Sequence, residues 1–154
     1  MAGSVRAMLK RITHTFIHVL DQDEATEFYV GKLGMVVNTD ADLGNMRWLT
    51  VSPPGQPELQ LVLMQPGPPA YDDATAEEIR ALVAKGGGGG GLIFETDDCR
   101  GTYQKLRAAG VEFTQEPTER FYGIDCALRD PFGNPIRFTQ PPADPVVVPP
   151  ADRL

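Results

Sequence analysis

The residues best suited to chemistry are two histidines and a glutamate in apolar, strand-like segments. His14 and His18 lie four residues apart in 11–19, and Glu58 opens the segment 58–64. Alternate residues of a strand point to opposite faces, so the two histidines share a face. His14 and Glu58 could act as an acid/base pair, or could join His18 around a divalent cation, because imidazole and carboxylate groups suit such ions. The alternatives are that His14 is an ordinary hydrogen-bonded strand residue and that His18 lies at an exposed strand end.

Arg137 argues against a cation at the same place. It stands between Ile136 and Phe138, so the alternation that packs its neighbours turns Arg137 to the other face. A guanidinium stays protonated and has no lone pair, so Arg137 cannot ligate a cation and would repel one. It could form an ion pair with Glu58, or it could present its two-pronged donor group to an anionic ligand. Both interpretations place Arg137 in a cavity.

The same alternation predicts which other side chains line that cavity. In 58–64 three leucines share one face, and in 46–51 Leu49 and Val51 do so, which leaves the opposite faces free of helix packing. The residues predicted to contact a ligand, besides His14 and Glu58, are Phe16, Trp48, Thr50, Gln60, Val62, Tyr122, Arg137 and Thr139. Phe16, Trp48 and Tyr122 would supply apolar contact area, although packing in the core or at its rim is the more ordinary role of aromatic residues.

These strands belong to an order of elements that occurs twice. A strand at 11–19 precedes a helix that begins at 21–24 and ends at Gly34, and strands follow at 35–39, 46–51 and 58–64. The second half has a strand at 92–96, a helix at 100–109 and strands at 111–114, 123–128 and 136–139. A surface helix at 74–85 and six glycines, Gly86 to Gly91, connect the halves. The glycines are interpreted as a flexible linker, because they lack the Lys and Ser/Thr of a phosphate-binding loop.

The two halves can be aligned residue by residue. Asp21 and Asp97 both stand between strand and helix, and 33–35 matches 109–111 at the same offset of 76 residues. A Pro-x-Gly-x-Pro turn occurs at 53–57 and again at 131–135, at an offset of 78. That turn pairs Glu58 with Ile136, which the alternation puts on opposite faces. Either a bulge separates the halves or one face is wrongly assigned.

Three motifs in this order resemble the vicinal-oxygen-chelate superfamily of glyoxalases, bleomycin-resistance proteins and extradiol dioxygenases. They are the residues 130–134 before the last strand, the stretch 21–29 leading into 33–35, and Tyr103-x-Lys105-Leu106 leading into Gly110-Val111. The resemblance spans about residues 11–140. It implies a single α+β domain of tandem βαβββ modules whose curled mixed sheets surround a cavity. Module one would cover about 11–65, the connection 66–91, module two 92–140 and a Pro-rich tail 141–154.

The resemblance also implies where a metal would bind. Enzymes of this superfamily typically take one ligand from the first strand of each module and one from the last. His14 matches the first His and Glu58 the first Glu, but the second His falls at or near Gly91 and the second Glu falls on Arg137. No cofactor and no standard metal site are therefore expected. A nonstandard site for Zn, Ni, Fe or Mn would have to use His14 and Glu58.

The composition bears on partners and location. A net charge of -7 disfavours nucleic acid, and no apolar run is long enough for a membrane span or a signal peptide. The two cysteines, Cys99 and Cys126, are too few for a secreted disulfide scaffold, so a cytoplasmic location is expected. Cys126 beside Asp125 is interpreted as a small buried apolar residue rather than a nucleophile. From the resemblance we expect a homodimer, which could also cover the Pro-rich tail.

Three functions remain open from the sequence. The first is a metal-independent binder of a small aromatic or amphipathic molecule, like the superfamily's drug-sequestering members. The second is a glyoxalase/dioxygenase-type enzyme, a lyase, isomerase or oxidoreductase, which uses a reduced metal site or acid/base chemistry by Glu58 and His14. The third is a non-catalytic regulatory or scaffold protein with a closed cavity. Loss of the standard metal ligands favours binding over catalysis.

Overall fold

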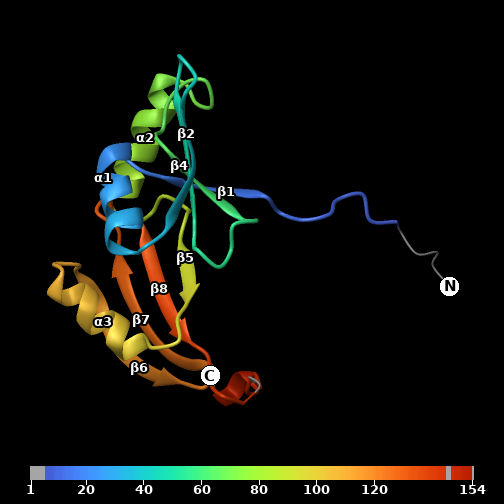
Figure 1. Cartoon of the computed structure of the whole chain (residues 1–154), viewed down its shortest axis with the longest axis vertical. Helices are drawn as coiled ribbons and strands as arrows, with labels where there is room; N and C mark the ends of the chain where they lie inside the picture. Colours follow the sequence, from blue (N-terminus) through green and yellow to red (C-terminus); the bar gives the residue numbers. More distant parts are fainter. Residues whose placement is uncertain (1–5, 145–146, 154) are drawn as a thin grey trace.

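Two four-stranded sheets with flanking helices make up the computed structural model, which describes residues 6–144 and 147–153 (Figure 1). The first five residues, Pro145 and Val146 of the tail, and the last residue lie outside the described part. The elements are β1 (His14–His18), α1 (Gln22–Thr26) with a π-helical continuation η1 (Glu27–Lys32), β2 (Val36–Asp42), β3 (Arg47–Ser52), β4 (Gln60–Met64), α2 (Asp73–Ala84), β5 (Leu92–Glu95), α3 (Cys99–Ala108), β6 (Phe113–Arg120), β7 (Gly123–Arg129), β8 (Pro135–Gln140) and η2 (Ala151–Arg153).

The strand order is the same in both sheets. The first sheet runs β1-β4-β3-β2 and the second runs β5-β8-β7-β6, with β1 parallel to β4, β5 parallel to β8 and the other pairs antiparallel. The predicted α+β fold of two βαβββ modules is confirmed. Within the described residues the sheets stay separate and do not close into a barrel.

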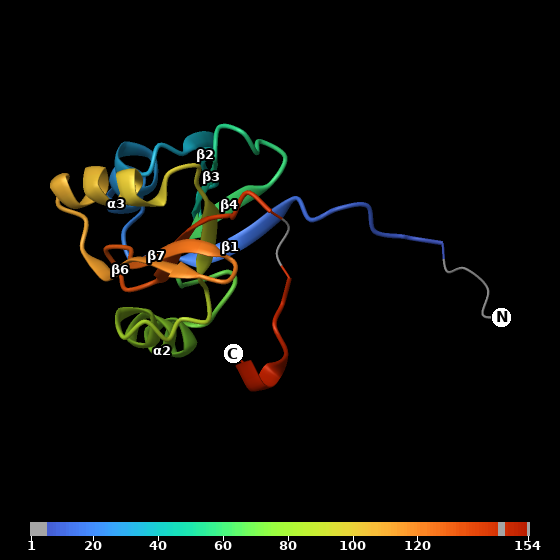
Figure 2. The ribbon, with the colours of Figure 1, turned by 90° about the horizontal axis from the view of Figure 1, so that it is seen from below.

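One face of each sheet packs into a shared apolar core. Ile17, Leu61 and Leu63 from the first sheet meet the core side chains of the second, which include Ile136 and Phe138. Figure 2 shows α1 and α3 on the same side of the two sheets. Fully burying one such aliphatic side chain is worth about 1.5–3 kcal/mol, so this layer holds the modules together. We call the opposite side of each sheet its open face.

The N-termini of α1 and α3 correct one detail of the predicted repeat. Asp21 Oδ1 accepts the Glu24 N–H at 2.8 Å at the start of α1, and Asp98 Oδ1 accepts the Gly101 N–H at 2.9 Å at the start of α3. Both are N-caps, because a short carboxylate can satisfy a free N–H of the first turn. The counterpart of Asp21 is therefore Asp98 rather than Asp97, at an offset of 77 residues.

Strand pairing explains why the alignment of the two proline turns matched Glu58 with Ile136, two residues that alternation assigns to opposite faces. Phe16 pairs with Val62 and Ile93 pairs with Arg137, so Val62 and Arg137 are equivalent at an offset of 75. The proline turns are offset by 78, which leaves three extra residues between the first turn and β4. An odd number of extra residues reverses the face that a simple alignment predicts. Glu58 falls within this longer turn and not in a strand.

The modules are joined by hydrogen bonds as well as by apolar packing. The Tyr29 hydroxyl of module one donates to Asp130 Oδ2 at 2.7 Å, and Asn134 Nδ2 donates to the backbone oxygen of His18 at 2.8 Å. Asp130 Oδ1 also accepts the backbone N–H groups of Phe132, Gly133 and Asn134. Burial and the neighbouring Asp130 carboxylate raise the pKa of Tyr29, which therefore stays a hydrogen-bond donor.

The glycine run is packed more closely than a flexible linker requires. A Cβ atom on Gly88 would lie 2.7 Å from Cγ2 of the fully buried Val83 in α2, and one on Gly90 would lie 3.5 Å from Ile17 in β1. Gly86 and Gly89 have φ of 77° and 78°, in the left-handed region that side chains disfavour. The run therefore fits a tight turn against the core.

Candidate functional site

Three aromatic rings lie together on the open face of the first sheet. Trp48 on β3 has its ring centroid 6.0 Å from that of His14 and 6.2 Å from that of Phe16, both on β1. Phe16 is 51% exposed although its neighbour Ile17 is buried in the core. We call these three residues the aromatic shelf. A flat apolar surface of this kind can stack against an aromatic ligand.

Three more of the predicted contact residues lie on the same face beside the shelf. Gln60 pairs with His14 and Val62 pairs with both Phe16 and Thr50 across the strands. The Thr50 hydroxyl donates to Gln60 Oε1 at 2.9 Å, which fixes the amide orientation. Thr50 and Val62 are buried, so they form a floor and Gln60 is the partly exposed polar group.

A charged cluster occupies the open face of the second sheet. Asp125 on β7 has a side chain that is only 1% exposed, and Arg137 Nη1 donates to its Oδ2 at 2.5 Å. The Tyr122 hydroxyl donates to the same oxygen at 3.0 Å, Gln115 Nε2 donates to Oδ1 at 3.1 Å, and Arg120 Nε lies 3.8 Å from Oδ1. We call these five residues the Asp125 cluster. Thr139 pairs with Asp125 across the strands and lies beside it.

The electrostatics of the cluster follow from the burial of Asp125. A buried carboxylate is costly unless it is paired and hydrogen-bonded, and here two guanidinium groups and two neutral donors surround it. Burial, the hydrogen bond to Asp125 and its charge raise the pKa of Tyr122, so Tyr122 remains a donor. Arg137 is still 46% exposed, which leaves part of its donor edge accessible to a ligand.

Two predictions about Glu58 are corrected. Glu58 is exposed in the turn before β4, because the three extra residues keep it out of the strand, and Arg137 pairs with Asp125 instead of with Glu58. The structure therefore does not bring Glu58 beside His14, where the paired residue is Gln60. The predicted site residues do not include Asp125. Alternation in β7 does indicate it, because Cys126 and Leu128 are buried and apolar and Asp125 takes the alternate face.

The residues at the metal-ligand positions that the resemblance implies do not fit a metal ion. His14 Nδ1 is hydrogen-bonded to the Thr13 hydroxyl at 2.9 Å, Gly91 has no donor atom, and Arg137 is committed to Asp125. His18 lies on the same face, but its ring packs 5.5 Å from Tyr71 and burial lowers its pKa. Among residues 6–144 and 147–153, no group of three or more His, Cys, Asp or Glu side chains could hold a metal.

The two thiols are packed inside the second module. Cys99 Sγ and Cys126 Sγ lie 3.6 Å apart and both side chains are fully buried. Burial raises the pKa of Cys126 to about 12, so the thiolate needed for nucleophilic attack is scarce at neutral pH. The prediction that Cys126 is a buried apolar residue is confirmed.

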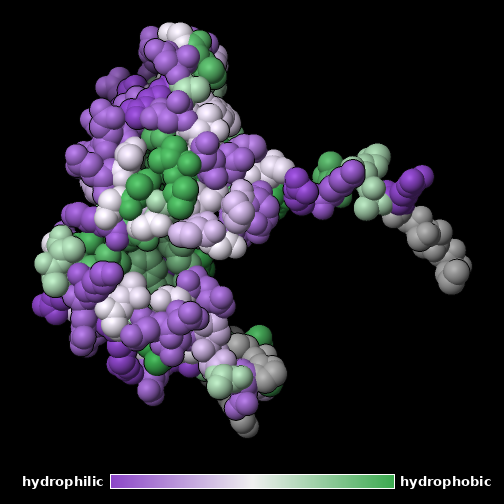
Figure 3. Space-filling view, viewed as in Figure 1, coloured by the Kyte–Doolittle hydropathy of each residue, from purple (hydrophilic) through white to green (hydrophobic). Residues whose placement is uncertain are grey.

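Two hollows lie where the two modules meet. Figure 3 shows a depression with an apolar floor between the two halves of the molecule. Two adjoining cavities of about 330 and 370 Å³ occur there, and they share Met35, Pro53, Phe94 and Glu95. We call the cavity of about 330 Å³, which borders α3, the seam groove. Neither cavity is lined by the aromatic shelf or by the Asp125 cluster.

The fold and the sequence together define the family. A family model described as "Glyoxalase/Bleomycin resistance protein/Dioxygenase superfamily" matches residues 11–138 of the chain. The chain belongs to this superfamily, which confirms the resemblance found in its motifs. No helix in the described part of the chain is long and apolar enough to cross a membrane.

Among the similar proteins is UcmS2, whose crystal structure is 45% identical, has a TM-score of 0.79 and matches 86% of this chain and 98% of its own. The crystal structure of TnmS3, "an antibiotic binding protein from Streptomyces sp. CB03234", is 26% identical with a TM-score of 0.70, covering 89% of this chain and 100% of that one. The uncharacterized protein YurT of Bacillus subtilis (strain 168) is 35% identical over 131 residues, which is 84% of this chain and 98% of YurT.

Proposed function

We propose that this protein binds a flat aromatic small molecule, stoichiometrically and without a metal, on its open faces. The observation that carries the proposal is the aromatic shelf, where Phe16 remains half exposed beside Trp48 and His14. A contiguous exposed apolar patch rimmed by polar residues commonly marks a binding site on a protein surface. Stacking on such rings needs no reacting group, so sequestration suits this site better than catalysis.

The charge balance of the second sheet narrows the ligand class. Arg137 is neutralised by Asp125, so the open faces attract a free anion less strongly than an unpaired guanidinium would. The exposed edge of Arg137 and the amide of Gln60 can still donate to carbonyl or hydroxyl oxygens. A neutral polycyclic aromatic compound with carbonyl substituents fits these groups. The antibiotic-binding description of TnmS3 supports a ligand of the antibiotic type.

The complete cavity in this proposal is formed by a homodimer. Phe16 and Ile93 are exposed on the open faces, and Met8, Leu9 and Ile12 are exposed on the arm that precedes β1 and extends away from the body (Figures 1 and 2). Large apolar side chains left in water on one side of a molecule favour association. A twofold pairing of open faces would place the aromatic shelf of one subunit against the other subunit and enclose the ligand.

Trp48 makes the proposal directly testable, since it is the single tryptophan of the chain. Titration with a hydroxylated anthraquinone should quench its fluorescence and saturate at one ligand per subunit, and the ligand should be recovered unchanged. Phe16→Ala should weaken binding about tenfold, which corresponds to about 1.4 kcal/mol of lost stacking and burial. Leu82→Ala, at an exposed apolar residue of α2, serves as the control and should leave the affinity unchanged.

Two results would contradict the proposal. One is an equal affinity of the wild-type protein and the Phe16→Ala variant for the anthraquinone. The other is near-stoichiometric Zn, Ni, Fe or Mn, measured by elemental analysis in protein purified without chelator. A bound metal would favour the alternative of a metal-dependent enzyme.

A further inference from the structure

We propose that the seam groove is a second binding site, which takes an amphipathic carboxylate with an unbranched apolar body. This site is independent of the aromatic shelf and lies on the helix side of the sheets. Both modules contribute to its walls. A ligand in the groove would therefore contact module one and module two at once.

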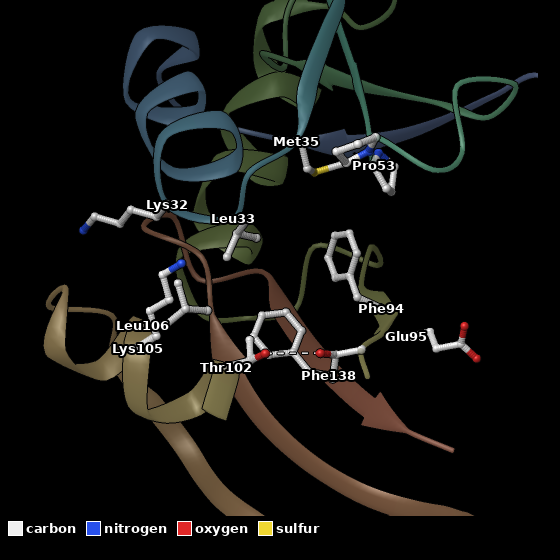
Figure 4. A pocket seen from close by; sticks show the side chains of 12 residues that line it. Lys32, Leu33, Met35, Pro53, Phe94, Glu95, Thr102, Lys105, Leu106 and Phe138 are labelled. Atoms are coloured by element: carbon white, nitrogen blue, oxygen red, sulfur yellow. Dashed lines mark hydrogen bonds between the residues drawn. The ribbon is translucent and has the colours of Figure 1, made fainter. Parts of the chain in front are cut away.

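The floor and walls of the groove are apolar. Leu33 and Met35 project from module one, and Phe94, Leu106 and Phe138 project from module two (Figure 4). The Phe94 and Phe138 rings meet edge to face with centroids 6.0 Å apart, and Phe138 is buried. A cavity of about 330 Å³ lies near the lower end of the range for small-ligand sites, which is about 300–1,000 Å³.

One end of the groove is positively charged. In Figure 4 the side chains of Lys32 and Lys105 lie at the same end, one from each module, while Glu95 lies at the opposite end and points away. Among the ion pairs formed by the described residues, none involves either lysine. Two unpaired ammonium groups beside an apolar trough complement a molecule with an acidic head and a hydrocarbon body.

The middle of the groove has little polarity to offer a ligand. Thr96 and Thr102 are its hydroxyl-bearing residues, and their oxygen atoms are hydrogen-bonded to each other at 3.1 Å. A ligand body that crosses them needs no hydrogen bonds of its own. This favours a hydrocarbon chain over a sugar or a peptide, whose polar groups would lose water without replacement.

Decanoate is a suitable probe and decanol is its neutral counterpart. In methyl-detected NMR of the full-length protein, decanoate should shift the Leu33, Met35 and Leu106 signals and leave Trp48 fluorescence unchanged. The double variant Lys32→Gln/Lys105→Gln, changed at two exposed positions, should weaken decanoate binding about three- to tenfold, because each exposed ion pair contributes modestly to affinity. Decanol binding should be unchanged. Lys85→Gln, at the end of α2, is the matched control.

Each outcome decides the proposal. Shifts in the groove that depend on Lys32 and Lys105 support it. Shifts in the groove that the double variant does not weaken would overturn the carboxylate assignment, and shifts confined to Ile93 or the aromatic shelf, or no shifts at all, would overturn the site. Anthraquinone quenching of Trp48 in the same double variant should match wild type, so this proposal and the proposed function fail separately.

Discussion

Asp125 is the residue on which the charge balance of the open faces depends. Asp125→Asn keeps the shape of the side chain but leaves Arg137 and Arg120 without their buried counter-charge. We expect a loss of about 1–3 kcal/mol in the free energy of unfolding, less than for a fully buried pair because Arg137 can be solvated. Urea denaturation measures this loss. The variant should also gain affinity for anionic aromatic compounds relative to neutral ones, which Trp48 fluorescence can follow.

The exposed pair between Arg100 and Glu119 provides the comparison. Its N···O distance is 3.4 Å and Glu119 is largely exposed, so Glu119→Gln should change stability by less than about 0.5 kcal/mol. Equal losses in the two variants would mean that the burial of Asp125 adds nothing to the pair.

How far single residues could be predicted depended on register. Strand alternation alone sends Phe16, Trp48, Gln60 and Arg137 to the faces opposite the core, which is where the structure has them. It failed for Glu58, because the three residues inserted in the turn leave Glu58 before the start of β4 at Gln60, where alternation no longer applies, and no local pattern marks that boundary. It also could not pair Arg137 with Asp125, since the pairing between β7 and β8 is set by the whole hairpin.

At the scale of elements, the packing of the glycine run predicts that alanine substitutions at two neighbouring glycines have different effects on the free energy of unfolding. Gly88→Ala would push a methyl group against the buried Val83, so we expect a loss of about 1–3 kcal/mol from overpacking. At Gly87 the nearest atom to an added Cβ is Leu82 O at 3.5 Å, an ordinary contact. Gly87→Ala should therefore be neutral or slightly stabilising, because alanine restricts the unfolded chain.

Thermal or urea unfolding of the two glycine variants measures this contrast. Similar stability of both variants would mean that the run is the flexible linker that its composition alone indicates.

The general order of elements was predictable from apolar periodicity and from the helix ends at Gly34 and Gly110. The π-helical form of η1 and the extension of β6 to Arg120 were not, because they depend on packing across the module rather than on local sequence.

At the scale of the whole molecule, the open faces make a prediction about assembly. We expect sedimentation to give a dimer at tens of micromolar, and Ile93→Asp to shift it toward the 16.8 kDa monomer, because a charge at this 75% exposed position would be buried in a pairing of open faces. Leu82→Asp on α2 is the control and should remain dimeric. A wild-type protein that sediments as a monomer would refute the pairing.

The hydrogen bonds from Tyr29 to Asp130 and from Asn134 to His18 also limit how this chain can be recombined. A chimera that takes one module from a relative keeps these hydrogen bonds only if the new module supplies the matching donor or acceptor. Without Tyr29, Asp130 would lose one of its buried donors, at a cost of about 1–3 kcal/mol. Modules that are connected by such hydrogen bonds can no longer be exchanged freely. Tyr29 and the 130–134 turn should therefore be inherited as a pair.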